Sequence, residues 1–93
     1  MSIIFTSRQF PKDWAQYKEA VQKYTAMARE YGCTMSKIYR RDGNTAEILW
    51  ISEWPSHDAV HKFGDKIGDE MNSYLVSPET DDAAWNPSDA AAI

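Results

Sequence analysis

Two histidines four residues apart are the side chains that most suggest chemistry in this sequence. His57 and His61 would lie on the same side of a helix that contains both. The spacing suits a metal ion, with Asp58 or Asp65 nearby, but no glutamate follows His57 as in zinc metalloproteases. No third ligand is fixed by spacing either. We therefore expect no metal and no bound cofactor, and we favour a surface or interface role for the pair.

The helix that would carry the histidines is predicted from Ser56, a good N-cap residue, to about Leu75. Its apolar stripe consists of Val60, Phe63, Ile67, Met71 and Tyr74. Gly64 and Gly68 interrupt the helix, and each costs about 1 kcal/mol relative to alanine. The histidines and glycines lie beside the stripe, on a shoulder that a ligand or another backbone could approach closely.

A first helix is predicted over residues 14–31. Asp13 can cap its start, and Gly32 can take the left-handed conformation just after its end. Spacings of three and four place its large side chains on one apolar face, formed by Trp14, Tyr17, Val21, Tyr24, Ala28 and Tyr31. Core packing accounts for this stripe.

Three strands are predicted, over residues 2–9, 33–41 and 46–54. Asp42-Gly43 between the last two is a strong hairpin signal. The third strand is apolar on both faces, whereas a sheet with one face in water should alternate cleanly. Helices can cover one face, and a partner subunit or a ligand should cover the other.

Residues 77–93 differ in character, with two prolines, four acidic residues and no strand-like run. We predict an irregular acidic C-terminal tail after an α+β domain of residues 1–76. Trp85 is the only large anchor in the tail, so we expect it to pack against the domain or a partner. The element order β-α-β-β-α is ferredoxin-like but lacks the fourth strand, with an antiparallel sheet and two helices on one face.

Charge and composition exclude several functions. The net charge is −4, with eight Lys or Arg against four acids in residues 1–45 and two against ten in residues 46–93. This balance, and the absence of a Lys/Arg-Gly-Phe signature in residues 46–53, argue against nucleic acid as a partner. No apolar run is long enough to cross a membrane. A single cysteine, Cys33, and no signal-like N-terminus indicate a cytoplasmic protein.

The passage from Ile48 to Phe63 resembles the third strand, Trp-x-Ser turn and second helix of the dimeric α/β-barrel proteins. Trp54 ends the strand, Ser56 caps the helix and Phe63 turns back onto the sheet. The nearest pattern is that of the antibiotic-biosynthesis-monooxygenase-like members, and the element order extends the resemblance over residues 2–75. The resemblance implies a homodimer in which each chain supplies a half-barrel.

The resemblance also implies a cavity for an apolar or aromatic small molecule, and a cofactor-independent monooxygenase or cyclase. Such an oxygenase would bind and deprotonate a phenolic substrate. The candidates for this are His57, His61, Tyr39 and Arg8, and the predicted pocket residues are Trp50 and Phe63. Tyr39 and Arg8 are equally well explained as sheet-surface residues, and Trp50 as core. The alternative function is a non-catalytic ligand-binding or protein-interaction module.

Haem-degrading relatives share this passage but use an axial histidine and a first-strand asparagine. On this chain those positions fall near Ser73 and Ser7, and Phe63 stands where those enzymes carry tryptophan. The substitutions argue against haem degradation.

Overall fold

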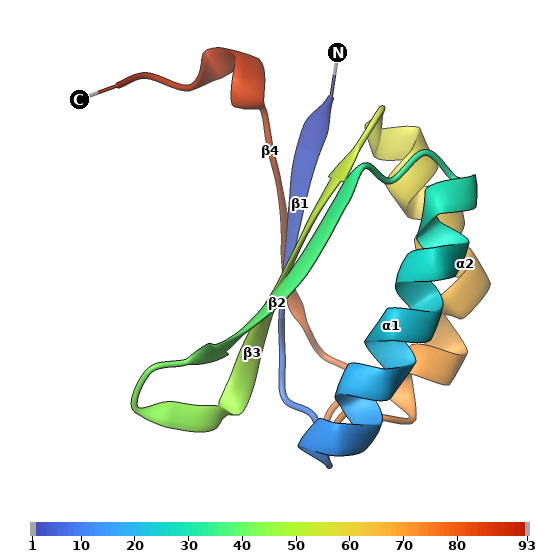
Figure 1. Cartoon of the computed structure of the whole chain (residues 1–93), viewed down its shortest axis with the longest axis vertical. Helices are drawn as coiled ribbons and strands as arrows, with labels where there is room; N and C mark the ends of the chain where they lie inside the picture. Colours follow the sequence, from blue (N-terminus) through green and yellow to red (C-terminus); the bar gives the residue numbers. More distant parts are fainter. Residues whose placement is uncertain (1, 93) are drawn as a thin grey trace.

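A four-stranded antiparallel sheet carries both helices on one face (Figure 1). This is the arrangement in a computed structural model, which describes residues 2–92. In chain order the elements are β1 (Ile3–Gln9), α1 (Trp14–Glu30), β2 (Met35–Arg41), β3 (Asn44–Trp54), α2 (His57–Asn72), β4 (Asp81–Trp85) and the short 3₁₀ turn η1 (Pro87–Asp89). The predicted α+β class, ferredoxin-like order and one-sided pair of helices are confirmed.

The prediction of an irregular tail without a fourth strand is wrong for residues 81–85. They form β4, which pairs antiparallel with β1 from Ile4 opposite Trp85 to Arg8 opposite Asp81 and completes the order β2-β3-β1-β4. Two aspartates and two alanines have low strand propensity, so the sequence carried no signal for this strand. β4 forms because it pairs with the edge of β1 that would otherwise be free.

Side-chain caps and one apolar core fix the helices on the sheet. Asp13 Oδ1 accepts a hydrogen bond from the Gln16 amide at 2.9 Å, and Ser56 Oγ accepts one from the Ala59 amide at 3.2 Å. The largest fully buried side chains are Trp54, Tyr17, Tyr24, Ile48 and Leu75. Helix α2 ends three residues before the predicted end, because Leu75 bridges instead to Pro11.

Glycine is required at the end of α1 for two separate reasons. Gly32 has φ +98°, and a Cβ there would lie 2.8 Å from Pro55 Cγ. Gly43 in the hairpin has φ +81°, with nothing within 4 Å of such a Cβ. We expect Gly32→Ala to lower the free energy of unfolding by about 1–2 kcal/mol, and Gly43→Ala by less, because only the first adds a clash to backbone strain. Urea titration of both variants checks this, and equal losses would contradict it.

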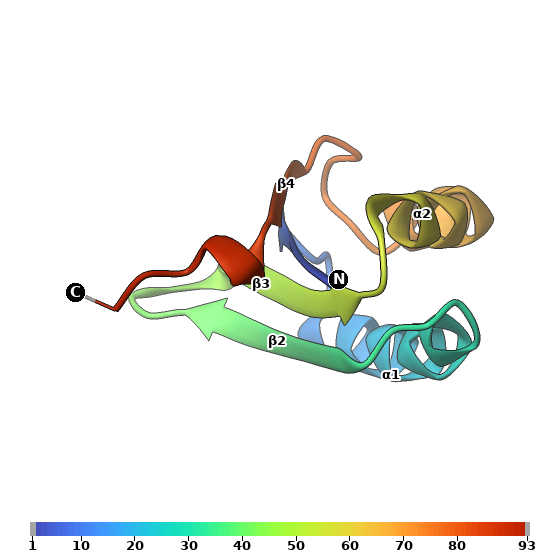
Figure 2. The ribbon, with the colours of Figure 1, turned by 90° about the horizontal axis from the view of Figure 1, so that it is seen from above.

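The face of the sheet away from the helices is uncovered within residues 2–92. Because side chains alternate along a strand, the register places Ile4, Leu49 and Ile51 on this face, opposite the buried Ile48 and Trp50. Figure 2 shows both helices on the other side, and the loop after α2 leading across to β4. The predicted two-sided apolarity of β3 is therefore present, and the second face is open.

Candidate functional site

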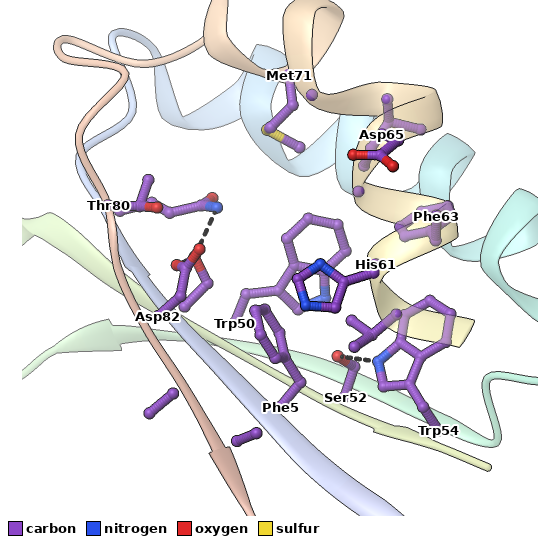
Figure 3. Close-up of a pocket in the computed structure, with 18 of the residues that line it drawn as sticks. Phe5, Trp50, Ser52, Trp54, His61, Phe63, Asp65, Met71, Thr80 and Asp82 are labelled. Atoms are coloured by element: carbon purple, nitrogen blue, oxygen red, sulfur yellow. Dashed lines mark hydrogen bonds between the residues drawn. The ribbon is translucent and has the colours of Figure 1, made fainter. Parts of the chain in front are cut away.

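A cleft of about 440 Å³ lies between α2 and the sheet. Its walls come from β1, β3, α2, β4 and the loop before β4 (Figure 3). Aromatic side chains from β1, β3 and α2 form much of its lining, namely Phe5, Trp50, Trp54 and Phe63. The size is within the range of ordinary small-molecule sites, and the apolar lining suits an aromatic guest.

Small residues on α2 leave this space open. Gly64 and Gly68 both line the cleft, and a Cβ built on either would have nothing within 4 Å. Neither has a positive φ. Neither a close contact nor the backbone conformation therefore requires glycine at these two positions. Each glycine in a helix interior nevertheless destabilises the helix by about 1 kcal/mol relative to alanine. Their effect is to widen the cleft.

Four of the six predicted site residues line the cleft: His57, His61, Trp50 and Phe63. The histidine rings stack edge to face with centroids 4.4 Å apart, and His61 projects from α2 into the cleft (Figure 3). Both histidines are exposed, whereas Trp50 and Phe63 are buried. A catalytic role for the histidines stays a prediction. Among residues 2–92, no group of three or more His, Cys, Asp or Glu is placed to hold a metal ion.

Arg8 and Tyr39 lie on the opposite, uncovered face of the sheet and are not part of the cleft. Arg8 contacts Glu47 and Asp81, each at 3.9 Å, and Tyr39 is 53% exposed. Glu47 is buried there and also bonds to Arg41 at 2.8 Å. Side chains alternate between the two faces of the sheet along β1. Ser7 faces the helices, so its neighbour Arg8 points away from the cleft.

A chain of hydrogen bonds that the sequence analysis missed leads from the core into the cleft. Tyr17 Oη donates to Gln9 Oε1 at 2.6 Å, and Gln9 Nε2 donates to Ser7 Oγ at 2.9 Å. Ser7 Oγ in turn donates to Asp82 Oδ1 at 2.5 Å. Burial raises the pKa of Tyr17 far above its ordinary value, so the phenol stays protonated and is the donor at its end of the chain.

One signal for this chain was present in the sequence. Ser7 and Gln9 share the helix-facing side of β1 with Phe5, where a plain core would carry apolar residues. Asp82 could not be included, because its strand was not foreseen.

None of the helices within residues 2–92 is sufficiently long and apolar to traverse a membrane.

With this geometry established, comparison with known proteins identifies the fold. No protein-family model and no curated protein matches the sequence. A variant of SnoaB, a cofactor-independent oxygenase from Streptomyces nogalater, has a TM-score of 0.76 at 11% identity, covering 96% of this chain and 95% of that one. An antibiotic biosynthesis monooxygenase gives 0.69 at 12%, covering 90% and 96%. Rv0793 from Mycobacterium tuberculosis gives 0.62 at 15%, covering 99% and 100%.

The chain therefore has the fold seen in SnoaB and in the antibiotic biosynthesis monooxygenase. At these identities the likeness concerns the fold. The chemistry has to be argued from the cleft.

Proposed function

We propose that this protein binds an apolar, aromatic small molecule in the cleft between α2 and the sheet, and oxygenates it without a bound cofactor. The observation that carries the proposal is the pair of cleft-lining helix glycines, Gly64 and Gly68, for which the packing gives no other reason. Residues that cost stability without serving the fold are expected at functional sites. The fold shared with SnoaB, described as a cofactor-independent oxygenase, supports the oxygenase part.

The chemistry needs an electron-rich phenol and a proton acceptor. His61 in the cleft, with His57 stacked on it, is the group we assign to accept the phenolic proton. For 1,5-dihydroxynaphthalene, O₂ then delivers one oxygen atom to the ring carbon para to the phenolate. The substrate loses that C–H hydrogen and the O–H hydrogen, which leave with the second oxygen atom as water. The product is the hydroxy-1,4-quinone, and the substrate supplies all the electrons.

Binding is tested by filling the cleft. Leucine at position 68 would project into open space, so Gly68→Leu should reduce the affinity for 1,5-dihydroxynaphthalene at least tenfold, while the removal of a helix glycine keeps the fold stable. Ala15→Leu, at an exposed position of α1, is the matched control and should bind normally. Tryptophan fluorescence titration measures both. Unchanged binding in Gly68→Leu would place the ligand elsewhere.

Turnover is tested separately, by oxygen consumption and by the colour of the quinone. Loss of a general base lowers the rate by about 10²–10⁴-fold, so His61→Gln should slow turnover at least a hundredfold while binding persists. Binding without any oxygen uptake by the unmodified protein would instead support the alternative, a non-catalytic ligand-binding module. Turnover at the normal rate in His61→Gln would remove this histidine from the mechanism.

The uncovered face of the sheet supports a second proposal, that two copies pair through it as a homodimer. It carries the half-buried Leu49 and Ile51 beside the exposed Tyr39 and Trp85. Exposed apolar surface of this kind marks interaction sites, and a self-complementary sheet face is suited to two-fold pairing. Light scattering at micromolar concentration should give twice the mass of the chain, and a monomer would overturn the pairing.

A further inference from the structure

The hydrogen-bond chain that ends at Asp82 has no evident purpose in the core. Ser7 and Gln9 are 5% and 6% exposed, and Tyr17 is fully buried. Apolar residues at these positions would avoid the cost of burying polar groups. Ser7 and Gln9 are buried members of the cleft lining, whereas Asp82, at the end of these hydrogen bonds, is an exposed one, on the β4 wall of the cleft (Figure 3).

The hydrogen bonds all point in one direction, from Tyr17 towards Asp82, and this direction makes Asp82 an acceptor. The phenol of Tyr17 has one hydrogen, which it donates to Gln9 Oε1, and so the amide nitrogen of Gln9 faces Ser7. Ser7 Oγ accepts from that nitrogen, and its own hydrogen goes to Asp82 Oδ1. Hydrogen bonds aligned in this way polarise and strengthen one another. Asp82 is therefore held as an acceptor, anchored through one oxygen.

The second oxygen of Asp82 remains available to a guest. No hydrogen bond to Asp82 Oδ2 occurs within the part of the chain that the structure describes, and the residue is exposed at the mouth of the cleft. The register places Asp82 directly opposite Ser7, on the side of the sheet that faces α2. A donor group on a ligand lying against the aromatic lining could reach it.

Apart from the two histidines, the ionisable side chains of the described residues that line the cleft are all acidic. Its described lining includes the carboxylates Asp65 and Asp82 and no lysine or arginine. An anionic ligand would meet these carboxylates and find no lysine or arginine beside them in that lining. A neutral ligand with a hydroxyl group would find an acceptor already oriented.

We propose that Asp82 is the specificity-determining acceptor of the cleft, and that it selects hydroxyl-bearing aromatic ligands over apolar and carboxylate analogues. The inference rests on the proposed function, because it presumes that an aromatic molecule binds there. Ser7 acts through Asp82 and is a positioning residue, as are Gln9 and Tyr17.

Three ligands with one skeleton test the proposal: naphthalene, 2-naphthol and 2-naphthoate. A hydrogen bond to a charged acceptor corresponds to about a tenfold change in affinity. The unmodified protein should therefore bind 2-naphthol about tenfold more tightly than naphthalene, and 2-naphthoate weakest. In Asp82→Asn the amide oxygen still accepts from Ser7, and the amide nitrogen then faces the guest as a donor. The preference of this variant should invert. It should bind 2-naphthol more weakly and 2-naphthoate more tightly than the unmodified protein does, and naphthalene with the same affinity.

Two further variants separate charge from geometry. Asp65→Asn removes a carboxylate from the cleft but lies on α2, outside the hydrogen-bond chain, so it should keep the preference for 2-naphthol. Ser7→Ala keeps the charge of Asp82 but removes the hydrogen bond that holds its carboxylate. It should reduce the preference for 2-naphthol without raising the affinity for 2-naphthoate.

The outcomes distinguish the two proposals. If naphthalene and 2-naphthol bind the unmodified protein equally well, and Gly68→Leu blocks both, Asp82 is not the selector although the cleft is the binding site. If Asp65→Asn inverts the preference as Asp82→Asn does, the effect is general charge and the assignment of Asp82 fails. If none of the three ligands binds, both proposals fall.

Discussion

Replacing Trp54 with alanine is expected to lower the free energy of unfolding by about 3–5 kcal/mol, the usual loss for a large buried aromatic. Trp54 is 2% exposed, packs against Phe63 with ring centroids 5.1 Å apart, and donates from Nε1 to Ser52 Oγ at 2.7 Å. The total free energy of unfolding of a small domain is only about 5–15 kcal/mol. The variant should therefore unfold at a much lower urea concentration, measured by far-ultraviolet circular dichroism.

Trp85 provides the matched control, since it is the same residue type but 58% exposed. Its Nε1 donates to Thr6 Oγ1 at 2.9 Å, and its backbone pairs with Ile4, so the expectation of docking on the domain is partly met. Trp85→Ala should change stability by at most about 0.5 kcal/mol at low protein concentration. A loss that appears only at high concentration would indicate that a second copy covers this residue. A Trp54→Ala variant as stable as Trp85→Ala would contradict the packing described for β3 and α2.

The second large effect concerns the buried pair Tyr17 and Gln9. Gln9→Leu leaves the Tyr17 hydroxyl, which is fully buried, without its acceptor, and takes the amide donor away from Ser7. We expect it to lower the free energy of unfolding by about 2–3 kcal/mol, because a buried polar group without a partner bears its full desolvation cost. Urea titration provides the measurement.

The double variant makes this test specific. Adding Tyr17→Phe to Gln9→Leu removes the orphaned hydroxyl, so the pair together should cost less than the sum of the two single losses, with a coupling of about 1–2 kcal/mol. Simple additivity would mean that the 2.6 Å hydrogen bond between them contributes little.

Most of the fold followed from periodic patterns and local signals. The stripe from Tyr17 to Ala28, the Asp13 and Ser56 caps and the Asp42-Gly43 turn each act over a few residues, so their physics is visible in the sequence. β4 was missed because its residues carry no such local signal, and its formation depends on an edge supplied by β1.

The site was predicted in part, for a related reason. His57, His61, Trp50 and Phe63 lie within fifteen residues of one another, where a strand and a helix of known periods place them on one side. Arg8 and Tyr39 were assigned to the site on residue type, without a register to decide between the two faces of the sheet. Asp82 needed both the missed strand and its register, which no local pattern contains.

The bond between Ser7 and Asp82 joins residues 75 positions apart, which bears on how the protein is made. During synthesis β1 emerges early and waits for β4, so the wall that holds Asp82 is added after both helices are complete. Pairings of this separation form slowly, because a long loop must close first. Until β4 pairs, β1 presents an unprotected edge to neighbouring chains. A ligand that bridges α2 and β4 would favour the completed chain, and would therefore improve recovery during refolding.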